Sequence, residues 1–198
     1  TNAGDDVGNY SITAQGTTTA NITAKTLTAT ASASNKVYDG TTTATATLTF
    51  TGLVGAETLG QSVGATFVDK DVANAKTVTV NSITLSDGDS GGVASNYSIS
   101  TGQTTTANIT AKALTIAGIT ASNKTYNGNT TATINVDSAT FTGLVDGDAV
   151  TVSAAGTFDN ENVGTNKTVT LVETNAGDDV GNYSITAQGT TTANITAK

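Results

Sequence analysis

The feature that most constrains the fold is an internal repeat of the sequence. The motif NYSI, followed after a short gap by TTTANITAK, begins at Asn9, Asn96 and Asn182, so its copies are 87 and then 86 residues apart. Periods of this length exceed the 20–50 residues of a solenoid unit, and each period is therefore expected to form a domain of its own.

The ends of the chain follow the same repeat, because residues 1–25 are identical to residues 174–198. Further landmarks recur within each period, such as FTGLV at Phe50 and at Phe141. We predict three regions, namely the C-terminal portion of a preceding repeat (1–25), one complete β repeat (26–112) and a second complete β repeat (113–198).

Apolar residues alternate with threonine in the pattern of β-strands. The stretch ATATLTF places Ala46, Leu48 and Phe50 on one face, and TTTANITA does the same with Ala107 and Ile109. A period of two is typical of a half-buried strand, and β-branched threonine suits the solvated face. In the first complete repeat the predicted strands are 27–34, 41–51, 62–68, 76–85, 96–101 and 104–111.

The spacing of these strands predicts an all-β chain of tandem small antiparallel β-sandwich repeats, immunoglobulin-like and of Greek-key type. A β-grasp-like fold is the alternative, and it requires an amphipathic helix for which the sequence shows no pattern. The last strand of one repeat runs into the first strand of the next at Lys25–Thr26 and at Lys112–Ala113 without a Gly-, Ser- or Pro-rich linker. We therefore expect a joint with little freedom to bend.

Composition excludes several classes of function. The chain has no Cys and no His, and all eight of its basic residues are Lys. Disulfides, thiolate nucleophiles and the commonest general base are therefore ruled out. A net charge of −8 disfavours nucleic acid and anionic lipid as partners, and no apolar run reaches the roughly 20 residues of a membrane-spanning helix. We expect no enzyme, no catalytic or cofactor-binding residue and no membrane insertion.

Acidic loops are the weak candidates for a metal site, since carboxylate oxygens are the ligands that calcium prefers. Their spacing matches no EF-hand, and the loops differ between the two copies, so we expect turns that work without calcium. The candidate residues are Asp69, Asp71, Asp87, Asp89, Asp146 and Asp148.

Two further motifs have structural and chemical interpretations. In YDG (Tyr38–Gly40) and YNG (Tyr126–Gly128), Asp or Asn precedes Gly, a pair typical of turns with positive φ. We expect turns there, with each tyrosine in the core or at a corner. Lysines recur at matching positions and leave two alternatives open, ordinary strand lysines or intramolecular isopeptide bonds; they are Lys36, Lys76, Lys124 and Lys167.

The segments ASNKVYDGTTTATATL and FVDKDVANAKTVTV carry a resemblance. They resemble the YDG repeat and the related mostly-β glycine-rich (MBG-type) repeats, which occur in tandem in very large secreted bacterial proteins, often beside filamentous-haemagglutinin-type secretion domains. The second copy departs from the motif with Asn127 in place of Asp39, which favours a turn role for this position. The resemblance implies an extracellular adhesin or surface fibre and brings no catalytic residues.

The expected function is that of stalk or spacer repeats in a secreted bacterial surface adhesin or extracellular fibre, holding a binding tip away from the cell. The expected partners are neighbouring repeats and, in a filament, other copies of the chain. Residues 1–25 are expected to form a hairpin that packs on the first repeat or complements another molecule. The alternative function is a carbohydrate- or protein-binding adhesin module, for which an exposed aromatic cluster would be the sign.

Overall fold

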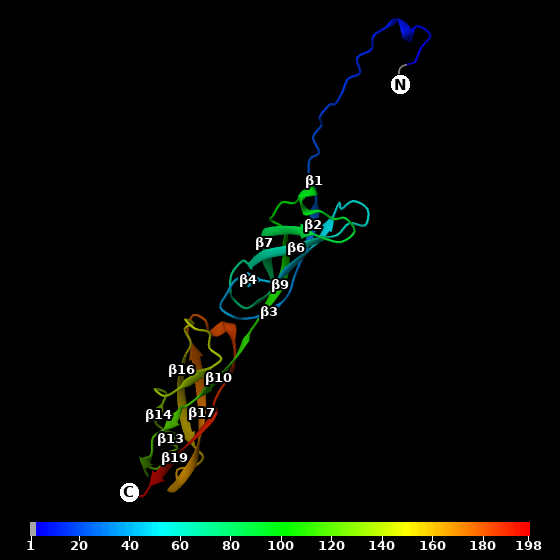
Figure 1. Cartoon of the computed structure of the whole chain (residues 1–198). Coiled ribbons are helices and arrows are strands. Elements are labelled where there is room, and N and C mark those ends of the chain that lie inside the picture. Colours follow the sequence, from blue (N-terminus) through cyan, green and yellow to red (C-terminus); the bar gives the residue numbers. More distant parts are fainter. Residues whose placement is uncertain (1–2) are drawn as a thin grey trace.

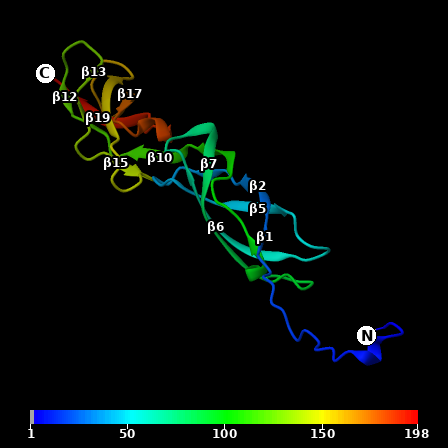
Figure 2. The ribbon, with the colours of Figure 1, turned by 90° about the horizontal axis from the view of Figure 1, so that it is seen from above.

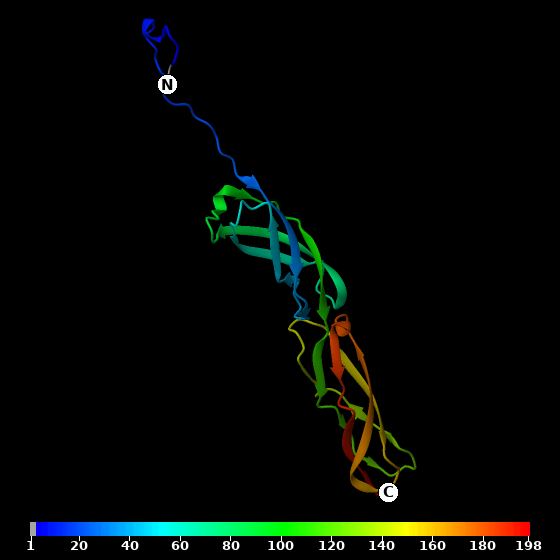
Figure 3. The same ribbon diagram turned by 90° about the vertical axis from the view of Figure 1, so that its right-hand side faces the viewer.

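The computed structural model describes residues 3–198 and shows two β-sandwich units arranged end to end (Figures 1 and 3). An N-terminal segment extends from the first unit, and the C-terminus lies at the opposite end of the molecule. The predicted all-β tandem sandwich is confirmed. Within the described residues there is no α-helix, only the short 3₁₀ helices η1 (Val7–Asn9), η2 (Ala94–Asn96) and η3 (Val180–Asn182), so the helix of the β-grasp alternative is missing.

The first repeat has a five-stranded sheet in the order β3-β9-β7-β6-β4, which is accompanied by the pairs β2-β5 and β1-β8. Each predicted strand overlaps an observed one. The predicted strand 41–51 is divided at Thr45 into two observed strands, β4 and β5. The strands are β1 (Lys25–Thr26), β2 (Thr28–Ala33), β3 (Lys36–Val37), β4 (Thr43–Ala44), β5 (Ala46–Thr51), β6 (Leu59–Phe67), β7 (Ala73–Asp87), β8 (Tyr97–Ser98) and β9 (Thr104–Thr110).

The second repeat has the same architecture, with a five-stranded sheet β12-β19-β17-β16-β13, a three-stranded sheet β15-β10-β18 and the pair β11-β14. Its strands are β10 (Lys112–Ala117), β11 (Thr120–Ala121), β12 (Lys124–Thr125), β13 (Thr131–Ala132), β14 (Ile134–Asn135), β15 (Thr140–Thr142), β16 (Thr151–Phe158), β17 (Gly164–Ala176), β18 (Tyr183–Thr186) and β19 (Thr190–Thr196).

Most strand pairs are antiparallel, as predicted, but two short pairings in each repeat are parallel. In the first repeat these are β1 with β8 and β3 with β9. The pairing of β3 with β9 forms where the chain changes sheets after β2, at a bend where Asn35 Oδ1 accepts a hydrogen bond of 2.7 Å from the backbone amide of Asn108. Asn123 and Asn194 repeat this contact at 2.7 Å in the second copy. The side-chain oxygen of this asparagine thus holds the bend before β3 against β9, and the bend before β12 against β19.

The core consists of the apolar faces that the alternation predicts. Leu48, Val78 and Ile109 are buried in the first repeat, and Val169 and Ile195 are buried in the second. The core of the first repeat does not stop at its own boundary, because the same buried cluster includes Leu114, Val150 and Tyr183. Apolar packing is therefore continuous from one repeat into the next.

The connection between the repeats is very short. β9 ends at Thr110 and β10 begins at Lys112, so that only Ala111 separates the two strands. The structure thus shows the direct passage from strand to strand that the sequence predicts.

The hairpin predicted for the N-terminal region is not formed in residues 3–24, and the first two residues of that region lie outside the described residues. The segment runs away from the first repeat (Figure 2), with Tyr10 73 % exposed, whereas its counterpart Tyr183 is 8 % exposed. The reason is a lack of neighbours. Residues 183–196 form strands by pairing with β10, β12 and β17, and no such strands lie beside residues 3–24.

Candidate functional site: the joint between the repeats

The YDG turn directs a tyrosine out of the first repeat. Tyr38 follows β3, and its amide donates a hydrogen bond of 2.8 Å to the carbonyl of Thr110. Gly40 completes the turn with φ +77°, which a residue with a side chain adopts only with strain. A Cβ at Gly40 would also lie 2.9 Å from Cγ1 of Val145 in the second repeat. The glycine therefore serves both the turn and the close approach of the repeats.

Tyr38 contacts an acid and a second tyrosine of the second repeat, Asp148 and Tyr183. Its hydroxyl donates a hydrogen bond of 2.8 Å to Asp148 Oδ2, and its ring meets the ring of Tyr183 edge to face, with centroids 5.6 Å apart at 76°. Tyr183 donates its own hydroxyl proton to the same Asp148 oxygen at 2.5 Å and accepts a hydrogen bond of 2.9 Å from the amide of Val145. Edge-to-face pairing and charge-assisted hydrogen bonds are among the stronger contacts between side chains.

Lys70 supplies the positive charge of the joint. Its Nζ lies 3.2 Å from Asp148 Oδ1 and 2.8 Å from Asp179 Oδ1, and 5.7 Å from the centre of the Tyr38 ring. The Asp148 side chain is only 4 % exposed. A buried carboxylate is tolerated only when it is paired and hydrogen-bonded, and Asp148 receives these partners from both repeats.

Hydrogen bonds of backbone amides and of the Asn182 side chain extend the joint beside the ion pairs. The amide of Val72 donates a hydrogen bond of 2.9 Å to Asn182 Oδ1, and Asn182 Nδ2 donates one of 3.3 Å to Asp71. Asp179 Oδ2 accepts from the amide of Ala149 at 3.0 Å, which fixes the acid before η3. The joint thus combines aromatic, ionic and backbone contacts.

The pKa values of the joint follow from these contacts. The Lys70 ammonium lowers the pKa of Asp179. Burial opposes ionisation of Asp148, but the hydrogen bonds from Tyr183, Tyr38 and Lys70 outweigh it and lower the pKa of Asp148. Burial, followed by the neighbouring Asp148, raises the pKa of Tyr183 to about 12. The neutral tyrosine and the charged acids are therefore the stable forms together.

These shifts predict how stability depends on pH. Asp148 and Asp179 have pKa values below their ordinary 3.8 in the folded chain, so their stabilisation is present above pH 3.8 and lost as the pH falls further. Tyr183 has its pKa raised from 10.0 to about 12, so its stabilisation is present below pH 10 and lost as the pH rises to about 12. We expect melting temperatures to fall in both ranges. Lys70→Met should flatten the acid limb, and an unchanged acid limb would contradict the assignment.

The six predicted calcium candidates do not come together. Asp148 and Asp71 lie in the joint, Asp69 pairs with Lys76, and Asp87 accepts a hydrogen bond from the amide of Ala94. Asp146 is exposed, and Asp89 hydrogen-bonds through its backbone to Thr58. No group of three or more acidic side chains within residues 3–198 is arranged to hold a metal ion. Independence from calcium stays a prediction.

The matching lysines have ordinary strand contacts. Lys36 and Lys124 lie over the rings of Phe67 and Phe158 and donate hydrogen bonds to their own turns. Lys76 and Lys167 are nearly buried, and they pair with Asp69 and Asp159. Hydrogen bonding from the ammonium of Lys167 lowers the pKa of Asp159. An ion pair of this kind favours the ordinary strand lysine over a nucleophilic amine.

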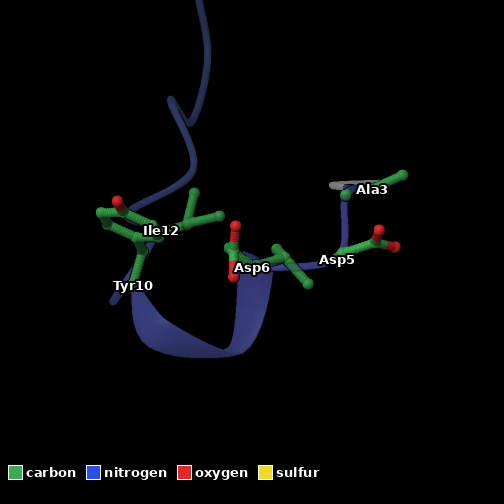
Figure 4. A pocket seen from close by; sticks show the side chains of 7 residues that line it. Ala3, Asp5, Asp6, Tyr10 and Ile12 are labelled. Carbon is green, nitrogen blue, oxygen red and sulfur yellow. The ribbon is translucent and has the colours of Figure 1, made fainter.

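An open hollow in the N-terminal segment is lined by Asp5, Asp6, Tyr10 and Ile12, among others (Figure 4). The side chains of Asp5, Asp6, Tyr10 and Ile12 are all exposed. In the second repeat the identical sequence forms η3 and β18, where Tyr183 packs in the joint. The hollow therefore arises because this segment has no neighbouring strands, and it is not a preformed binding site.

The sequence motifs single out Tyr38 and Asp148, but they do not reveal that these two residues contact each other in the joint. The sequence predicts that the tyrosine lies in the core or at a corner, and it makes the acid a weak calcium candidate. The sequence reasoning missed Lys70 and Asn182. A comparison of the two copies gives a signal for Lys70, because Glu161 occupies its position in the second repeat.

Two β-sandwiches joined through a packed interface define the chain as a tandem β-sandwich repeat protein. Residues 23–107 and 110–193 each match the YDG domain, and the chain therefore belongs to the YDG domain family. No curated protein and no solved structure matches the chain. Among the residues that the structure describes, no helix is long and apolar enough to cross a membrane.

Proposed function

We propose that these YDG domains are stalk or spacer repeats of a secreted bacterial surface adhesin or extracellular fibre of the MBG type, holding a binding tip away from the cell. The observation that carries this proposal is the joint, in which Tyr38 and Lys70 of one repeat are held by Asp148 of the next. A spacer keeps its tip at a distance only if its joints resist bending. Continuous apolar packing and a connection of one residue support that property.

The distribution of aromatic residues favours a spacer over a binding module. Of the nine Phe and Tyr residues, all within the described residues of the chain, only Tyr10 and Tyr126 are exposed. Tyr10 lies in the N-terminal segment and Tyr126 follows β12. The N-terminal segment and β12 lie at opposite ends of the molecule (Figure 2). Surfaces that bind sugars or proteins concentrate aromatic side chains, and these two residues form no such cluster.

Location is the aspect of this proposal that a direct experiment decides. Antibodies raised against residues 26–198 are expected to label intact cells of the source organism without permeabilisation. A cytoplasmic protein of the same cells serves as the control for integrity. Labelling that appears only after permeabilisation would contradict the surface location.

Self-assembly by strand complementation is a second aspect of the proposal. Ile22 is fully exposed, whereas its counterpart Ile195 is 1 % exposed within β19. Residues 3–24 thus carry a strand sequence that already fits the pairings of β18 and β19. We expect light scattering to show oligomers for the whole chain that disappear when the chain starts at Thr26. Oligomers that persist unchanged would contradict strand complementation.

A further inference from the structure

Both repeats carry the same tyrosine at the end that faces the C-terminus, but only one of them is covered. Tyr38 is 2 % exposed, and Tyr126, at the matching position, is 41 % exposed. Val163, the counterpart of Val72, is likewise exposed. We call Tyr38, Lys70 and Val72 the tyrosine face of the first repeat, and Tyr126, Glu161 and Val163 that of the second. The difference in exposure arises because the first face has a neighbouring repeat.

The opposite end of each repeat is built to receive such a face. Tyr97 in the first repeat donates its hydroxyl proton to Glu57 and accepts a hydrogen bond of 3.1 Å from the amide of Val54. Tyr183, Asp148 and Val145 make the same arrangement in the second repeat. We call these groups the acceptor faces. The first repeat thus has an acceptor face although no described residue covers it in the way that Tyr38 covers the second.

The charges on these faces differ between the copies. Lys70 on the first tyrosine face is replaced by Glu161 on the second. Asp179, which precedes η3 on the second acceptor face, is replaced by Val93 before η2 on the first. We call a repeat like residues 26–112 first-type and a repeat like residues 113–198 second-type. Against a second-type acceptor face, Glu161 would therefore meet two carboxylates, those of Asp148 and Asp179. Against a first-type acceptor face it would meet only the carboxylate of Glu57. Juxtaposed like charges in an interface suppress the wrong pairing.

We propose that the tyrosine face of the second repeat docks another YDG repeat of the first type, and that the residue at the Lys70/Glu161 position determines which type follows. A second-type repeat follows a first-type repeat because Lys70 pairs with its Asp148 and Asp179. A first-type repeat follows a second-type repeat because Glu161 is repelled by the two carboxylates of a second-type acceptor face. The order of the chain agrees with this rule. Residues 1–25, whose sequence closes the second repeat, directly precede the first. The inference concerns tandem order and does not depend on location, so failure of surface labelling leaves it standing.

Two extended chains test this inference. One carries a copy of residues 26–112 after Lys198, and the other carries a copy of residues 113–198 there. The readout is hydrogen exchange at the amide of Val163, because the equivalent Val72 amide is bonded across the existing joint. We expect this amide to exchange about tenfold or more slowly in the first extension than in the unextended chain, and to be unprotected in the second extension.

The variant Glu161→Lys is the matched control, since it recreates the contact of Lys70 with Asp148 and Asp179. It is expected to protect Val163 in the second extension. Absence of protection both in the first extension and in the second extension with Glu161→Lys would overturn the docking surface. Equal protection in both extensions without the substitution would overturn the charge rule. Tyr126→Ala should remove the protection in the first extension, and unchanged protection there would also count against docking through the tyrosine face.

Discussion

Replacing Tyr38 by alanine is expected to lower the free energy of unfolding by about 3 kcal/mol, because a large buried aromatic side chain and its contacts are lost. Tyr38 is 2 % exposed and connects the first repeat to Asp148 and Tyr183. The same substitution at Tyr126, which is 41 % exposed, is expected to cost less than about 1 kcal/mol. Urea unfolding of both variants gives the comparison.

The pair of variants controls for composition, since each loses one tyrosine of a matching turn. Equal losses at Tyr38 and Tyr126 would show that the tyrosine stabilises only its own repeat. That outcome would contradict the energetic role assigned to the joint.

Replacing Asp148 by asparagine is expected to cost about 2 kcal/mol of unfolding free energy, since hydrogen bonds to a charged group are worth roughly 1.5–3 kcal/mol. The carboxylate accepts from Tyr38 and Tyr183 and pairs with Lys70. An amide keeps the size of the side chain but leaves Lys70 with a weaker partner. Thermal and urea unfolding measure the loss.

Asp146→Asn is the matched control, because Asp146 is an exposed acid two residues away on the same loop. It removes the same charge and should change the stability by less than about 0.5 kcal/mol. If both variants lose the same amount, the effect belongs to net charge and not to the joint.

The fold could be predicted from the sequence because its signals are local. Alternation in ATATLTF is sufficient to predict β5 and the burial of Leu48, and Asn or Asp before Gly is sufficient for the turns. The parallel pairing of β3 with β9 could not be predicted in the same way. A strand of two residues has no periodicity, and its partner is distant along the chain.

The side-chain contacts of the joint could not be predicted for a related reason. Tyr38 and Asp148 are 110 residues apart, and nothing in either loop identifies the other as its partner. The hairpin predicted for residues 1–25 rests on the need to cover their sheet edge and apolar face. Alternation describes which face a strand can bury, and it does not say whether neighbouring strands are present.

The joint is expected to hold the two repeats in one arrangement. The chain has no cysteine of its own, so the variant Thr49→Cys/Thr174→Cys places one spin label on each repeat at exposed strand positions. Distances between the labels, measured by pulsed electron spin resonance, are expected to form one narrow distribution, which broadens when Lys70→Glu is added. A broad distribution in the chain with Lys70 intact would contradict this expectation.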